Sequence, residues 1–244
     1  MSGGPAWAPY CGPGPGPGDW LARWNLDPVL LSVLALGLAL ILWRSEGRQR
    51  AAGVGAVAVL AVVFVSPLCA LSSALFAART VHHVLLVAVA APLIAGALPR
   101  RRVGPLALAT AAQAVAFWAW HAPAAYGWGL SNEAAYWLMQ LSLLGTAAWF
   151  WAAVRRAPAP AAVAALLLAM VAMGLLGALL TFTGEPVYPP HFLTTAAWGM
   201  TPLQDQQAAG LIMWAPAAAV YLAAALLVLG RWIGPDARPG ASPA

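Results

Sequence analysis

Two adjacent histidines and an arginine stand at the start of an apolar run in this sequence. Arg79, His82 and His83 open the stretch RTVHHVLLVAVAAPLIAGALP, residues 79–99, which is long enough to cross a bilayer as a helix. Arg79 precedes the histidines by three and four residues, so it can neighbour either one on a helix surface. An ionisable group inside a membrane helix costs about 2.5–3.5 kcal/mol on insertion scales and usually has a partner or a task. The stretch therefore predicts a polar site near one end of a membrane helix.

The composition is that of an integral membrane protein. Of the 244 residues, 62% are hydrophobic and 8% are charged, whereas soluble domains carry about 25% charged residues. The formal net charge of +5 comes from arginines in short clusters between apolar runs, which does not indicate nucleic-acid binding. The sequence contains no lysine, which excludes a cofactor held as a lysine Schiff base, as in a retinal protein.

Apolar runs divide the chain and predict an all-α, polytopic membrane helix bundle. We expect a flexible or extended Gly- and Pro-rich segment over residues 1–27, a transmembrane domain over 28–232 and a short cytoplasmic tail over 233–244. The domain is expected to contain about seven transmembrane helices. They are placed near residues 28–43, 51–66, 80–98, 105–120, 134–154, 159–182 and 205–229.

The arginines predict how the bundle is oriented. Ten of the twelve follow the first, third, fifth and seventh runs: Arg44, Arg48, Arg50, Arg100, Arg101, Arg102, Arg155, Arg156, Arg231 and Arg238. Because arginine-rich connections stay in the cytoplasm, the N-terminus is expected outside and the C-terminus in the cytoplasm. Cys11 and Cys69 form no zinc motif, and a disulfide between them is possible if both face an oxidising side.

This orientation places all four histidines of the chain at the outer ends of helices or on the outer loop. Imidazole and thioether groups suit copper, and histidine with carboxylate suits several divalent metals. The candidate metal ligands are therefore His82, His83, His121, Asp205 and Met213, with copper as the expected ion. Side chains expected to line the pocket or orient the ligands are Arg79, Glu185, Tyr188 and Gln206.

These side chains also have structural interpretations. A histidine at a helix end often makes only an interhelical hydrogen bond. Arg79 can extend to the lipid headgroups. Asp205 can cap its own helix. What these interpretations leave unexplained is that polar groups from separate helices are expected at the same depth.

Several motifs carry a resemblance to a known family. The segments HHVLLVAVAAPLIAGALP, WAWHAPAAYGWGL, GALLTFTGEPVYP and TPLQDQQAAGLIMWAPAAAVYL resemble the CtaG-like family of cytochrome c oxidase assembly factors, over roughly residues 60–232. Its most specific parts here are residues 118–123 and 205–214. The resemblance implies a seven-span protein of the bacterial cytoplasmic (inner) membrane that is not an enzyme. It also implies a role in making active haem–copper oxidase, with copper handling as the expected task.

Only some of the residues at the positions of the family's motifs match those motifs in this chain. His83 matches the second histidine of an H-x-x-x-H pattern, whose first position is Arg79 in this chain. His121 matches a W-x-x-H histidine, and Asp205 with Gln206 match a DQ pair. Gln140 stands where a further family histidine falls. The family implies oxidase subunits as partners, with a periplasmic copper chaperone as a further expected partner and the lipid bilayer around them.

Three other functions stay open on the sequence alone. His83 and His121 could ligate haem in a haem- or quinone-binding redox protein. Arg79, Asp205 and the histidines could relay protons in a transporter, although the middle of the runs holds few polar groups. A metal-free scaffold for oxidase subunits is the third alternative, because Arg79 and Gln140 replace family histidines.

Overall fold

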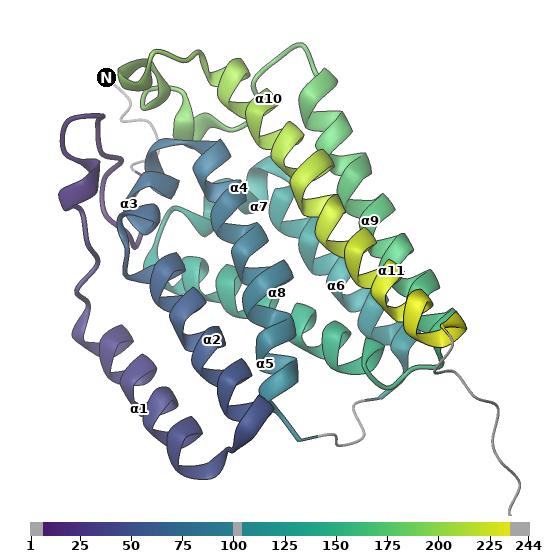
Figure 1. Cartoon of the computed structure of the whole chain (residues 1–244). Helices are drawn as coiled ribbons and strands as arrows, with labels where there is room; N and C mark the ends of the chain where they lie inside the picture. The colour runs from purple at the N-terminus through teal and green to yellow at the C-terminus, as the bar shows by residue number, and fades with distance from the viewer. Residues whose placement is uncertain (1–6, 100–103, 235–244) are drawn as a thin grey trace, which may run out of the picture.

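The computed structural model describes residues 7–99 and 104–234, and within these ranges the regular structure is helical (Figure 1). The α-helices are α1 (Pro28–Arg44), α2 (Gly47–Phe64), α3 (Pro67–Ala74), α4 (Phe76–Val84), α5 (Ala91–Ala97), α6 (Leu106–His121), α7 (Pro123–Gly129), α8 (Glu133–Val154), α9 (Ala159–Phe182), α10 (Pro202–Ile212) and α11 (Ala218–Ile233). A π-helical turn, Leu85–Ala90, joins α4 to α5, and another, Met213–Ala217, joins α10 to α11.

The predicted helical membrane bundle is confirmed at the level of helix content and apolarity. Five helical elements are long and apolar enough to cross a membrane: Gly47–Phe64, Phe76–Ala97, Glu133–Val154, Ala159–Phe182 and Pro202–Ile233. The helix Pro28–Arg44 is apolar but shorter. The count of seven spans and the orientation of the termini stay predictions. Four of the arginines used to predict that orientation lie outside the described residues: Arg100, Arg101, Arg102 and Arg238.

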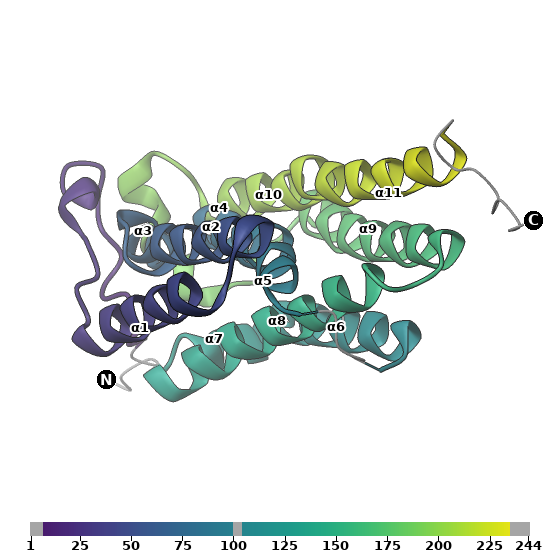
Figure 2. The same cartoon turned by 60° about the horizontal axis from the view of Figure 1, so that its bottom comes forward.

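The α4–α5 element lies at the centre of the bundle. It packs against α2, α8 and α10, while α1 lies at the periphery against α2 (Figures 1 and 2). On the other side, α9 runs beside α10 and α11, and α6 pairs with α8. We call the end of the bundle where α6 ends and α8 and α10 begin the loop end. It carries α3, α7 and the connection 183–201.

The helix boundaries differ from the predicted ones where proline begins a new helix. The second apolar run, predicted through residue 66, ends as a helix at Phe64, and Pro67 starts the separate helix α3. Proline suits a first helical turn because its missing N–H would have no partner there. Pro123 starts α7 in the same way, between the helices predicted near residues 105–120 and 134–154. The third helix begins at Phe76 instead of residue 80, and the last runs from Pro202 to Ile233.

Both π-helical turns accompany a proline in the middle of a long helix. Pro216 lies inside the turn Met213–Ala217, and Pro92 is the second residue after the turn Leu85–Ala90. Proline cannot donate a backbone hydrogen bond, and its ring crowds the carbonyl four residues earlier. A π turn widens the helix locally and relieves that crowding. The two long elements therefore continue through the bundle with their hydrogen bonding adjusted instead of breaking.

Two glycines let α9 and α10 approach each other backbone to backbone. A Cβ atom at Gly210 would lie 2.6 Å from the carbonyl oxygen of Gly177 and 2.8 Å from the backbone nitrogen of Thr181. A Cβ atom at Gly177 would lie 2.7 Å from the carbonyl oxygen of Gly210. Because the crowding atoms belong to backbone, a side chain at either position would push the two helices apart. Small residues at such contacts are typical of membrane helix pairs.

We predict that Gly210→Ala destabilises the protein although alanine favours helix formation. The new methyl group overlaps the backbone of α9, and overpacking of this kind costs about 1–3 kcal/mol. The matched control is Gly37→Ala in α1, where an added Cβ meets nothing within 4 Å. Thermal unfolding of purified protein should show a lower midpoint for Gly210→Ala and an unchanged or higher one for Gly37→Ala. Equal midpoints would contradict the close helix contact.

Candidate metal and polar site at the loop end

Helix α4 places three ionisable side chains inside the bundle. The side chains of Arg79 and His82 have no exposed surface, and His83 is 4% exposed. All three lie on the nine-residue helix α4, which begins inside the protein because α3 ends directly before it. Its position within the helix bundle therefore decides where these polar groups lie.

Three imidazoles form a row across α4 and α6. The ring centroids of His82 and His83 are 5.6 Å apart, and those of His83 and His121 are 5.9 Å apart. His121 donates its Nδ1–H to the carbonyl oxygen of Phe117 at 2.6 Å, so its Nε2 carries a free lone pair. We call His82, His83 and His121 the histidine row.

The two histidines of the row that lie on α4 have ring nitrogens without a hydrogen-bond partner in the protein. Neither ring nitrogen of His82 has a hydrogen-bond partner in the described chain, and the same holds for Nδ1 of His83. Nε2 of His83 lies 3.5 Å from the side-chain nitrogen of Gln140. A buried imidazole nitrogen without a partner is unusual, because buried polar groups are nearly always hydrogen-bonded. The row therefore has nitrogen atoms available for a ligand.

Arg79 introduces a buried positive charge beside the histidine row. Its Nε donates to the carbonyl oxygen of Ser72 at 3.1 Å, and its guanidinium lies 5.5 Å from the ring centroid of Tyr136. Within the described ranges, neither Nη atom has a hydrogen-bond partner, and no acidic side chain pairs with the guanidinium. A buried charge without a counter-ion is expensive. Its positive charge opposes a second cation at His82 or His83.

Asp205, predicted as a metal ligand, caps the N-terminus of α4. Its Oδ2 accepts the backbone N–H of Phe76 at 2.6 Å, and its Oδ1 accepts that of Ala77 at 3.0 Å. The first N–H groups of a helix have no partner within the helix, and a carboxylate also suits the positive end of the helix dipole. Both carboxylate oxygens are therefore engaged in holding α4 to α10.

Met213 begins the π turn after α10, and its Cβ atom lies close to Gly177 of α9. Of the five predicted ligands, the structure thus gathers His82, His83 and His121 into one row. Asp205 serves a helix terminus and Met213 packs at the α9 contact. Over residues 7–99 and 104–234, no three His, Cys, Asp or Glu side chains stand close enough together to hold an ion as they are.

The predicted pocket residues Glu185, Tyr188 and Gln206 hold the connection 183–201 against α6 and α10. Gln206 accepts the backbone N–H of Val187 at 2.8 Å and donates to the carbonyl oxygen of Glu185 at 3.2 Å. Tyr188 donates its hydroxyl hydrogen to the carbonyl oxygen of His121 at 2.8 Å, and its ring stacks on Phe76. The side chain of Glu185 is exposed, so this residue contributes its backbone.

His191, the fourth histidine, has a structural role. It donates from Nδ1 to the carbonyl oxygen of Ala74 at 3.3 Å, and its Nε2 accepts the hydroxyl hydrogen of Tyr126 at 2.6 Å. Burial, with the charge of Arg79 as a lesser cause, lowers the pKa of His191 to about 3. The ring is therefore neutral at physiological pH and occupied at both nitrogens.

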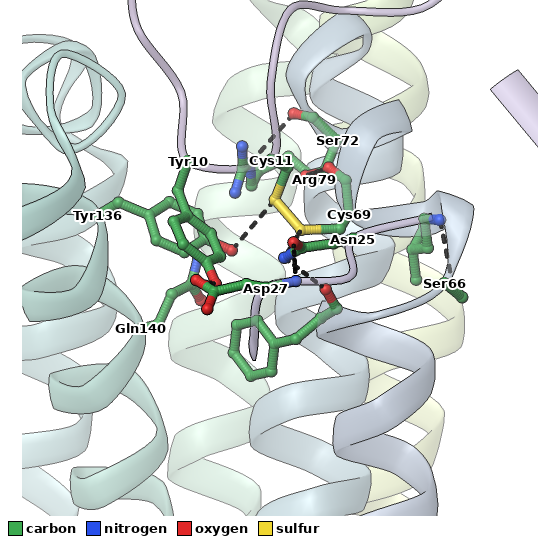
Figure 3. The surroundings of a disulfide bond; sticks show 12 residues. Tyr10, Cys11, Asn25, Asp27, Ser66, Cys69, Ser72, Arg79, Tyr136 and Gln140 are labelled. Carbon is green, nitrogen blue, oxygen red and sulfur yellow. Dashed lines mark hydrogen bonds between the residues drawn. A yellow bond between two sulfur atoms is a disulfide. The ribbon is translucent and has the colours of Figure 1, made fainter. Parts of the chain in front are cut away.

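A disulfide ties the N-terminal segment to the loop end. Cys11 and Cys69 are bonded, with Cα atoms 5.4 Å apart (Figure 3), which resolves a pairing that the sequence left open. Tyr10 stacks on Tyr136 at 5.1 Å and donates to Asp27 at 2.6 Å. This hydrogen bond from Tyr10 holds the pKa of Asp27 below its usual range. The segment thus packs on Tyr136, whose ring also lies beside the guanidinium of Arg79.

Sequence reasoning missed the tyrosines that surround the site. Tyr126 and Tyr136 are fully buried beside Arg79 and His191, and Tyr10 covers Tyr136. A signal was available, because a tyrosine in an apolar helix needs a partner for its hydroxyl group. Sequence spacing could not reveal which helix supplies that partner.

Fold and site together define a class: an α-helical membrane protein whose buried polar site lies under loops at one end of the bundle. A family model described as "Cytochrome c oxidase caa3 assembly factor (Caa3_CtaG)" matches residues 100–234, more than half of the chain. The chain therefore belongs to the caa3 oxidase assembly factor family. The match covers α6 to α11 and so includes His121, Asp205 and Gln206, whereas α4 precedes it. No curated protein and no solved structure matches the chain.

We predict that Asp205→Ala destabilises the protein by about 1–3 kcal/mol, because it leaves the buried N–H group of Phe76 and the partly buried N–H group of Ala77 without acceptors. Asp205→Asn keeps one acceptor and should cost less. Thermal unfolding checks this order, and copper affinity measured on the asparagine variant separates capping from ligation. A stable Asp205→Asn protein that has lost copper would show that the carboxylate is a ligand instead of a cap.

Proposed function

We propose that the protein assists cytochrome c oxidase assembly by holding copper transiently at the histidine row and passing it on. One observation carries this proposal: three buried imidazoles stand in a row with unpartnered ring nitrogens, in a chain of the oxidase assembly family. Copper is here a cargo, and no catalytic turnover is assigned to the protein.

The chemistry of the row suits copper. Imidazole nitrogen is a suitable ligand for copper ions, and metal–imidazole bonds are about 2.0 Å long. Adjacent rings with centroids 5.6 and 5.9 Å apart can share one ion after modest side-chain rotation. His83 stands in the middle of the row and can pair with either neighbour.

The surroundings favour weak binding. Arg79 repels a cation at His82 and His83, and the carboxylate of Asp205 is engaged by amide groups of α4. Both features lower the affinity that three histidines would otherwise give. A carrier must release its cargo, so modest affinity is compatible with delivery.

The predicted orientation brings copper from the outer side. The arginine distribution favours a loop end on the outer side, and a disulfide at that end agrees with an oxidising compartment. Bound copper would then be available to the oxidase on the side from which a periplasmic chaperone could supply it. The bacterial inner membrane is the compartment proposed for this protein and for the oxidase.

The alternative of a haem held between His83 and His121 fits less well. Their rings lie 5.9 Å apart at an interplanar angle of 81°, so α4 and α6 would have to separate to admit a macrocycle. A metal-free scaffold remains the second candidate, because Asp205, Gln206 and Tyr188 all form hydrogen bonds that hold the loop end together.

We predict that purified protein binds Cu(I) and that the double variant His83→Gln/His121→Gln binds it at least about tenfold more weakly. Anaerobic competition with a chromogenic Cu(I) chelator measures the affinity. His191→Gln is the matched control, because its ring lies outside the row and both nitrogens are occupied. Unchanged copper affinity in the double variant would remove the histidine row from the mechanism. A metal-free wild-type protein on which oxidase assembly still depends would favour the scaffold.

We further predict that Arg79→His tightens copper binding by about tenfold or more, which corresponds to about 1.4 kcal/mol. The change removes a buried positive charge and adds an imidazole four residues before His83. Arg79→Gln is the control that removes the charge without adding a ligand, and it should give a smaller gain. Size-exclusion profiles confirm that both variants fold. Equal or weaker affinity in both variants would show that Arg79 does not oppose the metal.

A further inference from the structure

The histidine row is enclosed, so a metal ion needs a way in. His82 has no exposed surface, and His83 and His121 are each 4% exposed. An ion can therefore reach the row only past the side chains packed around it. One part of this cover is the N-terminal strap, which we define as residues 7–27 and which runs beside α3 at the loop end (Figure 1). The strap carries Cys11, so the disulfide belongs to the cover.

One sulfur atom of the disulfide is separated from the buried charge of Arg79 by a single side chain. Cys11 Sγ lies 3.5 Å from the hydroxyl oxygen of Tyr136, and the ring of Tyr136 lies 5.5 Å from the guanidinium of Arg79 (Figure 3). Cys11 is therefore close to the polar site although it belongs to a surface segment.

The other sulfur atom approaches the histidine row through α2. The side-chain nitrogen of Asn25 lies 3.9 Å from Cys69 Sγ and 3.1 Å from the carbonyl oxygen of Phe64. The ring of Phe64 packs edge-on against that of His82, with centroids 5.3 Å apart. Phe64 is therefore the side chain between the disulfide and the first imidazole of the row.

Each sulfur atom has a hydrogen-bond donor beside it. Neither sulfur of a disulfide carries a hydrogen, so the hydroxyl group of Tyr136 donates to Cys11 and the amide of Asn25 donates to Cys69. Such donors stabilise negative charge on sulfur. Sulfur becomes negative when it leaves in thiol–disulfide exchange and when it binds a metal. The surroundings therefore suit a pair of cysteines that is also used in the reduced form.

The disulfide is accessible from the side of the strap. Cys11 is partly exposed, whereas Cys69 is fully buried. A hollow of about 510 Å³ is lined by Pro9 and Gly12, close to Cys11 on both sides of it in the chain, and by Asn132 before α8. An external thiolate is therefore expected to attack Cys11 Sγ, with Cys69 as the leaving thiolate.

We infer that Cys11 and Cys69, once reduced, bind Cu(I) and load it into the histidine row. A dithiol protein supplies the two electrons: its thiols become a disulfide, and Cys11 and Cys69 become thiols. Thiolate sulfur is a soft ligand that suits Cu(I), and both thiol protons pass to solvent as the ion binds. The loading step rests on the proposed copper function of the row, whereas binding to the cysteine pair does not.

The charge of Arg79 favours the ion at the cysteine pair over the ion at the row. Two thiolates and Cu(I) form a complex with one net negative charge, which a nearby guanidinium attracts. The same ion on the imidazoles of the row keeps its positive charge, which the guanidinium repels. Copper should therefore stay at the pair for as long as the pair is reduced.

Re-formation of the disulfide releases the ion toward the row. Exchange with the disulfide of a partner protein joins the sulfur atoms of Cys11 and Cys69 and returns two electrons to the partner, whose thiolates take up protons from solvent. Copper remains Cu(I) and loses both ligands. His82, behind Phe64, has two ring nitrogens without a partner in the described residues and can accept it.

The test titrates Cu(I) anaerobically into the purified full-length protein, either untreated or after reduction with dithiothreitol that is removed before the titration. A chromogenic chelator measures the bound copper, and X-ray absorption at the copper edge identifies its ligand atoms. We expect the reduced protein to bind one further equivalent of Cu(I) through sulfur. The variant Cys11→Ser/Cys69→Ser, treated in the same way, should lack this equivalent.

Two further variants keep the result interpretable. His83→Gln/His121→Gln should retain the sulfur-bound equivalent even if the row binds no copper, so failure of the proposed row leaves this binding site testable. Tyr136→Phe retains the ring between Tyr10 and Arg79 but removes the donor to Cys11. It should weaken Cu(I) binding at the pair by about tenfold, which tests the pair even if the serine variant folds poorly.

Re-oxidation tests the loading step. Oxidised glutathione added to the copper-loaded reduced protein should change the copper ligands from sulfur to nitrogen, while copper lost to the chelator instead would overturn the loading role. A disulfide that dithiothreitol reduces only in unfolded protein would overturn the inference and make the bond purely structural. So would a reduced protein that binds no more copper than the untreated one, or a further equivalent that survives in the serine variant.

Discussion

The structure depends on the contact between the carboxylate of Asp205 and the first turn of α4. Helix α4 begins within the protein, so its first N–H groups cannot be hydrated and need acceptors. Asp205 provides two, at 2.6 and 3.0 Å, from a different helix. This contact fixes where α4 begins, and the start of α4 decides where Arg79, His82 and His83 lie. Gln206, the next residue, holds the connection that covers them. Two adjacent residues of α10 thus position both α4, which carries Arg79 and two histidines, and the connection that lies over them.

Electrostatics explains why a row of histidines need not become a tight metal site. Three imidazoles would favour a cation, while a fully buried arginine beside them opposes one. Removing charges from water is expensive, and within the described ranges no carboxylate neutralises Arg79. The balance favours weak coordination. Transfer to a partner that binds the ion more tightly would then be downhill.

The sequence predicted the helical membrane bundle and the side chains of the histidine row, because apolar runs and helix-end polarity are local properties. It did not predict that Asp205 caps α4, since that depends on which helix lies beside α10. It gave no sign of α7 or of the tyrosines around Arg79, whose partners come from distant segments. The pairing of Cys11 with Cys69 stayed open for the same reason: residues 58 positions apart meet only once the bundle has formed. Local patterns thus indicated which groups could act, and tertiary packing decided which of them meet.

Helix α6 supplies the third imidazole of the histidine row. Its last residue, His121, is the end of the histidine row, and in its middle Gln113 donates from Nε2 to the hydroxyl oxygen of Tyr221 at 2.9 Å. Tyr188 holds the carbonyl of His121 from above, and Phe117 holds its ring from below. Tyr188 belongs to the connection 183–201, whereas Phe117 lies one turn before His121 on α6 itself. Because both contacts end on His121, a displacement of α6 against that connection would change how the imidazole faces His83. The packing of α6 therefore fixes the geometry of the third imidazole of the histidine row.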